Sequence, residues 1–365
     1  MGVLHQELRM PPRQAPSSHR AAPRRGGHAA TRGTGVRIDS WNLPLRHPEG
    51  GFLGDRASQT AFRELLDQAR RAHSTCARDP FGRTPTAELD KREIDMVLVG
   101  GDPDAAHVVH LAVEEYARAL VAVVRSFIAQ PEWRGVRDIV LGGGFPGHEA
   151  GRLAIRRAAR LLKLARSGVR LRVLGHDSDE GGLLGWVQLA PSAALRRQAF
   201  LAVDIGGTNI RCGIVEPRLG EDRSGGKARI LEHAQWRHAD DAPTREEALQ
   251  RLGAMLNGLA AHARTRGIDL AAFVGIACPG EVDARGHLLN GAQNLPGDWA
   301  AEDFFLADAL GAWLAPVRGR APRVLLHNDA VVQGLSERPR MRNAKRWGVL
   351  TIGTGLGNAS YSNLG

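Results

Sequence analysis

Cysteine is scarce in this sequence, and its spacing excludes two classes of protein. The 365 residues include three cysteines, Cys76, Cys212 and Cys278, which are widely separated along the chain. An odd number of cysteines at such spacing predicts neither a disulfide framework nor a cysteine-based metal cluster. We therefore expect reduced thiols in or near a hydrophobic core.

Long apolar runs are also missing. No stretch is long and apolar enough to cross a membrane, and no hydrophobic signal segment follows the pair Arg24-Arg25. We therefore expect a cytoplasmic protein without a membrane partner. The chain also lacks the GK[ST] of a P-loop and the Rossmann pattern with its following acid, so these two nucleotide-binding folds are not predicted.

Acidic residues are nearly absent from the first part of the chain. Met1–Arg37 contains seven arginines and a single acid, Glu7, within a formal net charge of +10 for the whole chain. Few large apolar residues are present there to offset the entropy of ordering, so we expect residues 1–35 to be a disordered basic tail. A nucleic-acid-binding arm is the alternative. No helix-turn-helix periodicity accompanies the arginines, and we expect no nucleic-acid partner.

Strands and helices alternate through the remainder, which is long enough for two domains. Asp102 can cap a long helix that begins at Pro103, and Thr244 with Glu247 forms a capping box for another. Alternation of this kind predicts an α/β fold with two lobes. Further helices are expected at 57–73, 149–166 and 181–190, and apolar strands at 139–141, 169–174, 271–277, 324–326 and 348–352.

Three glycine-rich turns follow predicted strands. Consecutive glycines let backbone N–H groups reach an anion, and two such turns can hold one polyphosphate from two sides. For each turn alone, a simple hairpin or strand-to-helix turn is the alternative. The turns are DIGGTN with Asp204, Gly206, Gly207 and Thr208, GTGLG with Gly353, Thr354 and Gly355, and LGGGF with Gly142, Gly143 and Gly144.

A possible catalytic carboxylate lies in HNDA. Asp329 follows a predicted buried strand and stands beside Asn328 at the start of a predicted helix. An aspartate there can be a helix N-cap and nothing more. A carboxylate at the carboxyl end of a strand can equally serve as a general base for a hydroxyl group.

Together, DIGGT, CPGEVD with NLPGDW, HNDA, GTGLG and LGGG resemble the motif set of the ROK family of sugar kinases and the related bacterial glucokinases. These proteins belong to the actin/hexokinase-like ATPase superfamily, with a ribonuclease H-like fold. The resemblance covers most of Phe200–Gly365 and, more weakly, Val36–Pro191. It implies ATP- and Mg²⁺-dependent phosphorylation of a hexose hydroxyl.

The resemblance also implies roles for individual positions. Asp204 would help to hold Mg²⁺ through water, and Asp329 would be the general base. The turns Gly206–Thr208 and Gly353–Gly355 would contact the ATP phosphates, and Gly142–Gly144 would lie near adenosine. Sugar hydroxyls would be bound by Asn294, Asn328 and Glu49.

Two features depart from the family pattern. The sugar motif E-x-G-H of the family is matched here by PEGGF, so Phe52 stands where the family has histidine, and the neighbouring His47 is an alternative. Sugar identity is therefore left open. The cysteine-rich zinc motif of many ROK proteins is absent, and we expect no structural zinc.

The order of the motifs also differs from the family order. In the family the DxGGT hairpin is near the amino terminus and the glycine-rich adenosine motif comes late, whereas here LGGGF precedes DIGGT. We interpret the sequence as a circular permutation. Residues 36–198 with 348–365 would form the large lobe and 199–347 the small lobe, with NASYSN at 358–363 pairing beside GVRIDSWN at 35–42.

Two alternatives to a self-sufficient kinase remain. The family includes transcriptional repressors, so a non-catalytic sugar or nucleotide sensor is one. Residues 1–35 are too short and proline-rich for the winged helix of such repressors. The other is a chain whose hairpin is completed by a partner chain, as in a domain-swapped homodimer.

Overall fold

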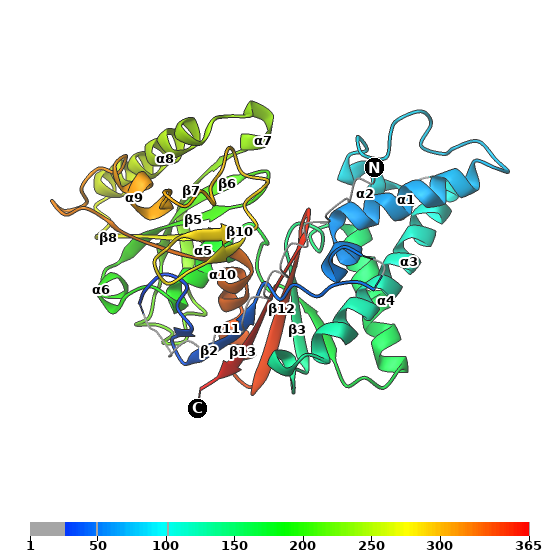
Figure 1. Cartoon of the computed structure of the whole chain (residues 1–365), viewed down its shortest axis with the longest axis horizontal. Helices are drawn as coiled ribbons and strands as arrows, with labels where there is room; N and C mark the ends of the chain where they lie inside the picture. Colours follow the sequence, from blue (N-terminus) through cyan, green and yellow to red (C-terminus); the bar gives the residue numbers. More distant parts are fainter. Residues whose placement is uncertain (1–25, 49, 101, 365) are drawn as a thin grey trace, which may run out of the picture.

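The computed structural model describes residues 26–48, 50–100 and 102–364. Two β-sheets, each flanked by helices, form two lobes (Figure 1). This architecture confirms the predicted two-lobed α/β class. No helix within the described ranges is long and apolar enough to span a bilayer.

The large lobe is built on a six-stranded sheet. Its strands are β1 (Arg32–Gly33), β2 (Val36–Trp41), β3 (Asp138–Gly142), β4 (Arg170–Val173), β12 (Arg346–Ile352) and β13 (Leu356–Asn363), in the order β1-β2-β13-β12-β3-β4. Its helices are η1 (Leu53–Ala57), α1 (Gln59–His73), α2 (Lys91–Gly100), α3 (Pro103–Ile128), η2 (Pro131–Trp133) and α4 (Glu149–Leu164). Asp102 caps α3 as predicted, because its side chain accepts a hydrogen bond from the backbone N–H of Asp104. The stripe of apolar residues along α3 is buried against α1 and α4.

Two segments that are far apart in the sequence lie side by side in this sheet. Strand β13 pairs antiparallel with β2, with Asn363 opposite Val36 and Ala359 opposite Trp41. The predicted pairing of residues 358–363 beside 35–42 is therefore confirmed. On its other side β13 forms a hairpin with β12, which runs parallel to β3.

The small lobe contains a five-stranded sheet and a two-stranded ribbon. The sheet strands are β5 (Ala199–Ile205), β6 (Ile210–Glu216), β7 (Arg229–Trp236), β8 (Leu270–Cys278) and β11 (Arg323–Asn328), in the order β11-β8-β5-β6-β7, and the ribbon is β9 (Glu281–Val282) with β10 (Leu288–Asn290). The lobe's helices are α7 (His238–Asp241), α8 (Arg245–Thr265) and α9 (Leu306–Gly311). The predicted capping box of α8 is present, since Thr244 and Glu247 exchange side-chain and backbone hydrogen bonds.

The remaining helices are short. These are α5 (Gly181–Leu184), η3 (Gly185–Gln188), α6 (Ser192–Leu195), α10 (Asp329–Ser336) and α11 (Arg338–Met341). α10 contacts α5 and η3 and also β12 and β13 of the large lobe. Trp186 of η3 packs edge-on against Phe273 of β8, with ring centroids 6.0 Å apart. Residues 181–195 thus pack on the small-lobe sheet, which differs from the predicted lobe boundary at residue 198.

The segment 26–35 is also placed, which corrects the predicted extent of the basic tail. Ala29 donates its N–H to the carbonyl of Leu326 at 3.0 Å, and the ring of His327 bonds to the carbonyl of Ala30 at 2.9 Å. β11 is the edge strand of its sheet, and this segment bonds to the backbone carbonyl and N–H of Leu326 on that edge. The prediction of disorder is therefore wrong for residues 26–35. Residues 1–25 lie outside the described residues.

Candidate functional site

Two carboxylates meet at one edge of the small-lobe sheet. β5, β8 and β11 run parallel to one another, so their carboxyl ends lie at the same edge. Asp204 is the penultimate residue of β5 and is in register with Ala277, whereas Asp329 comes directly after β11. Chain positions 125 residues apart are thereby brought to one place.

Asp329 is the first residue of α10 and is only partly exposed. Its Oδ1 accepts hydrogen bonds from the N–H of Ala330 at 2.8 Å and from Nδ2 of Asn328 at 3.0 Å. Burial raises the pKa of Asp329 to about 7, and the negative charge of Asp204 acts in the same direction. A carboxyl group with this pKa can exchange a proton near neutral pH.

Asn328 is fully buried, and its side-chain amide is occupied by protein groups. Nδ2 donates to the carbonyl of Gly280 at 2.9 Å as well as to Asp329, and Oδ1 accepts from the N–H of Val331 at 3.2 Å. The N-cap alternative considered for this motif thus applies to Asn328 and not to Asp329. The cap fixes the start of α10 and therefore the position of the carboxylate.

Asp204 lies against the backbone of α5. A Cβ added at Gly182 would stand 2.4 Å from Cγ of Asp204, so only glycine allows this approach. Nη1 of Arg211 is 3.8 Å from Oδ2 of Asp204, and Nη2 of the same arginine is 2.8 Å from the carboxylate of Asp179. Burial raises the pKa of Asp204 to about 6, Arg211 opposes the rise, and Asp179 adds to it.

The first glycine turn, Gly206–Thr208, joins β5 to β6 beside these carboxylates. The N–H of Gly206 donates to the carbonyl of Asn209 at 2.8 Å, and the ring of His238 bonds to the carbonyl of Gly206 at 2.8 Å. Gly207 is exposed, and a Cβ there would stand 3.2 Å from Cβ of Asn294. The structure therefore places Asn294 next to this turn.

The other two glycine turns lie together at one edge of the large-lobe sheet. Gly142 of β3 is in register with Thr351 of β12. Gly143 has φ of +82°, and a Cβ there would stand 2.4 Å from the carbonyl oxygen of Ile352. The turn Gly353–Gly355, closed by a 2.9 Å bond from the N–H of Gly353 to the carbonyl of Gly355, begins one residue later.

Helix α10 connects the two groups of residues. A Cβ at Gly357 would stand 3.0 Å from Cβ of Ala330, the residue after Asp329. A Cβ at Gly142 would stand 2.3 Å from Oε1 of Gln333 on the next turn of the helix. Helix α10 thus carries Asp329 at its start and packs against the glycine-rich strand ends of the large lobe.

Glu49 lies outside the described residues, and its predicted contact with sugar is not tested. An antiparallel bridge joins Arg46 to Phe52. Phe52 is 43% exposed, and the guanidinium of Arg46 lies 4.3 Å from its ring centroid. The ring in the expected histidine position is therefore covered by a cation.

Arg211 and Asp179 were missed by the sequence analysis. Arg211 could have been found, because it is the cross-strand partner of Asp204 in the β5–β6 hairpin. Asp179 lies in the loop before α5, and nothing in its local sequence indicates a contact with Arg211.

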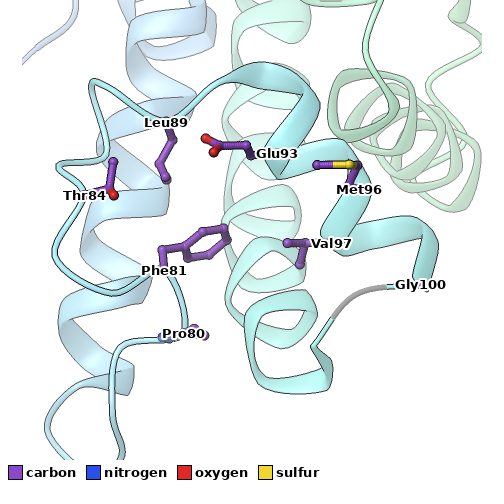
Figure 2. Close-up of a pocket in the computed structure, with 8 residues that line it drawn as sticks. All are labelled: Pro80, Phe81, Thr84, Leu89, Glu93, Met96, Val97 and Gly100. Atoms are coloured by element: carbon purple, nitrogen blue, oxygen red, sulfur yellow. The ribbon is translucent and has the colours of Figure 1, made fainter.

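A hollow on the large lobe is lined by a different set of residues (Figure 2). Its volume is about 440 Å³, and it lies between α2 and the loop before it. Apolar side chains dominate its lining, which contains none of the predicted site residues. The lining residues are Pro80, Phe81, Thr84, Leu89, Glu93, Met96, Val97 and Gly100.

Comparisons with known proteins give matches to solved structures alone. No protein-family model and no curated protein matches the chain. Similar structures include a ROK family glucokinase from Streptomyces griseus in complex with glucose and AMPPNP, at 24% identity and a TM-score of 0.31, covering 46% of this chain and 45% of that one. A ROK hexokinase from Thermus thermophilus has 23% identity and a TM-score of 0.28, and the match covers 44% of this chain and 45% of that one. An exopolyphosphatase from Cytophaga hutchinsonii has 12% identity and a TM-score of 0.27, and the match covers 48% of this chain and 52% of that one. The chain therefore spans about half the length of each.

Proposed function

We propose that this chain is an ATP-dependent sugar kinase, which transfers the γ-phosphate of ATP to a hexose hydroxyl. The observation that carries the proposal is the placement of Asp329. It is a partly buried carboxylate with a pKa raised to about 7, and it stands at the head of the helix that touches the glycine turns. A base with that pKa accepts a hydroxyl proton at neutral pH, which readies the oxygen for attack on phosphorus.

The neighbouring asparagines have different roles in this proposal. Asn294 is exposed beside Gly207, so its amide is free to bind a sugar hydroxyl. The amide of Asn328 already bonds to Gly280, Val331 and Asp329. We therefore assign Asn328 to positioning Asp329 and not to direct contact with sugar.

The residues present fit magnesium and ATP. Asp204 has its nearest cationic atom 3.8 Å away, so the carboxylate keeps capacity for a metal or its water shell. Across the described part of the chain, no group of three His, Cys, Asp or Glu side chains could hold a metal by itself. This fits Mg²⁺, which keeps several waters and takes its other ligands from substrate phosphates. When bound, Mg²⁺ would neutralise phosphate charge, and the glycine turns would offer N–H groups to the phosphate oxygens.

A coupled assay of ADP release tests this function. We expect turnover with Mg-ATP only when a sugar is added, and a panel of hexoses, amino sugars and N-acetyl sugars would identify the substrate. Binding of ATP or sugar without turnover on any member of the panel would contradict the kinase proposal. That result would favour a non-catalytic sensor.

We also propose that the chain is a circular permutation of the sugar-kinase order. The antiparallel pairing of β13 with β2 supports it, because Asn363 and Val36 are direct register partners. A turn of two to four residues can join the ends of such a pair. The strands on either side of the proposed break are therefore already arranged as a hairpin.

Reordering the chain tests the permutation. A short turn would join Asn363 to Val36, and a new amino terminus would be opened before Ala199. We expect this variant to keep the secondary structure of a control that lacks residues 1–35 but has the original order. We also expect its melting temperature to lie within a few degrees of the control. Failure of the reordered chain to fold while the control folds would contradict the proposal.

A further inference from the structure

Lys91 is the first residue of α2 and lies beside a glycine turn of the candidate site. Its Nζ is 3.9 Å from the point that a Cβ would occupy at Gly144. The neighbouring Gly143 contacts the carbonyl of Ile352, which leads directly into the Gly353–Gly355 turn. The ammonium group is therefore close to both glycine turns of the large lobe.

Lys91 is half-buried, and within the described part of the chain no carboxylate lies in ion-pair contact with it. Among the described residues, none forms a hydrogen bond or an ion pair with its ammonium group. Asp95, which lines the same narrow hollow, is already bonded to the N–H of Ala150 at 3.1 Å and lies 3.5 Å from Nδ1 of His148. A half-buried cation with no carboxylate in direct contact is costly, and a bound anion would lower that cost.

The surroundings of Lys91 are also positively charged. Burial lowers the pKa of Lys91, and Arg63 and Arg237 lower it further, against smaller opposing effects of Asp179 and Asp90. The carboxylate of Asp179 is itself 2.8 Å from a guanidinium nitrogen of Arg211. Arg237 is also paired, with Asp240 at 2.8 Å, but the two arginines still outweigh the two aspartates in their effect on the pKa of Lys91.

Arg237 reaches this region from the opposite lobe. It immediately precedes α7, whose first residue, His238, bonds to the carbonyl of Gly206. In Figure 1, α7 and α2 lie on facing sides of the two lobes. Cations from both lobes thus act on the space between the Gly206–Thr208 and Gly142–Gly144 turns.

From this arrangement we propose that Lys91 binds the polyphosphate of the nucleotide from the large-lobe side. The inference rests on the proposed kinase function and adds a cation that none of the glycine motifs contains. A lysine ammonium binds phosphate as a compact point charge, whereas the turns supply neutral N–H groups. Lys91 should therefore distinguish nucleotides by their phosphates and not by their base.

Calorimetric titration with Mg-ATP, Mg-ADP, AMP and adenosine tests the proposal. Lys91→Met keeps the apolar stem and removes the charge. We expect it to bind Mg-ATP and Mg-ADP about tenfold or more weakly, because a charge-assisted contact is lost. Adenosine affinity should stay within about twofold, and Lys91→Arg should recover part of the loss. Arg92→Met removes the same charge from the exposed neighbouring residue and should bind all four like the parent.

Each other outcome overturns a different statement. If the parent binds Mg-ATP and Lys91→Met binds it equally well, or loses adenosine as strongly, the inference fails and the kinase proposal stands. If the parent binds none of the four nucleotides, the kinase proposal itself fails.

Discussion

Asp329→Asn should lower the rate of sugar phosphorylation by about 10³-fold, within the range of 10² to 10⁴ typical of a lost general base. The amide has the shape of the carboxylate and can still accept the hydrogen bond from Ala330, so the start of α10 should be preserved. The affinity for Mg-ATP should change little. Steady-state kinetics and nucleotide titration on the same preparation would separate the two effects. Asp303→Asn, which alters an exposed carboxylate of the small lobe, is the matched control.

If the proposed function holds, the same carboxylate should govern the pH dependence of sugar phosphorylation by the parent chain. Asp329 must be ionised to accept a proton, and its pKa is raised to about 7, so kcat/KM should fall about tenfold per unit as the pH drops below that value. The pKa of Asp204 is also raised, to about 6. The midpoint of the pH–rate profile therefore reflects both aspartates and not Asp329 alone. A flat profile between pH 5 and 8 would contradict the assignment of Asp329 as base.

The free energy of unfolding should fall with rising pH, whereas kcat/KM should rise. The folded pKa of each aspartate lies above its unfolded value of about 3.9, so the folded state binds more protons between about pH 4 and 7. Their contribution to stability is fully present below about pH 4 and is lost as the pH rises through 6 to 7. Asp329→Asn removes the buried charge and should raise the melting temperature by a few degrees at pH 8, on the order of 2 kcal/mol, but hardly at pH 4, where the unfolded carboxyl group is still largely protonated. An equal shift at both pH values would show that the effect is not due to ionisation.

Gly185→Ala should destabilise the protein by about 3 kcal/mol or more, and it can prevent folding altogether. The added Cβ would stand 1.7 Å from the backbone carbonyl oxygen of Val332, which lies in α10. Backbone cannot rotate away as a flexible side chain can, so η3 and α10 would have to separate. Urea unfolding followed by circular dichroism measures the loss.

Gly258→Ala is the matched control for this substitution. Gly258 is an exposed residue inside α8, and a Cβ there would have no heavy atom within 4 Å. Alanine should therefore stabilise the chain by up to about 1 kcal/mol, because it has the higher helix propensity. A fall in the free energy of unfolding for Gly185→Ala together with a rise for Gly258→Ala would support the packing of η3 on α10. Similar small effects would contradict it.

Local sequence signals predicted individual elements well. Asp102 and Thr244 mark the starts of α3 and α8, because capping depends on hydrogen bonds within one turn of chain. The pairing of β13 with β2 was also predicted, but from the order of motifs and not from propensity. For the candidate site, the strand-end position of Asp204 and Asp329 follows from the strand pattern alone.

Contacts that depend on tertiary structure could not be predicted. The segment 26–35 has few apolar residues, yet a backbone hydrogen bond holds it against the edge strand β11. Residues 181–195 follow the large-lobe motifs in sequence but pack on the small-lobe sheet through Trp186. The contact between Arg211 and Asp179 joins a hairpin to a loop 32 positions earlier in the chain. No local pattern specifies such pairs.

The most direct test of the central claim is label transfer from [γ-³²P]ATP to sugar, with the parent and Asp329→Ala compared at equal protein concentration. Label transfer follows phosphorylation itself, whereas ADP release also counts hydrolysis of ATP. We predict labelled sugar phosphate with the parent and a loss of about 10³-fold in the variant. Labelled inorganic phosphate alone, or equal transfer by both proteins, would contradict a sugar kinase with Asp329 as its base.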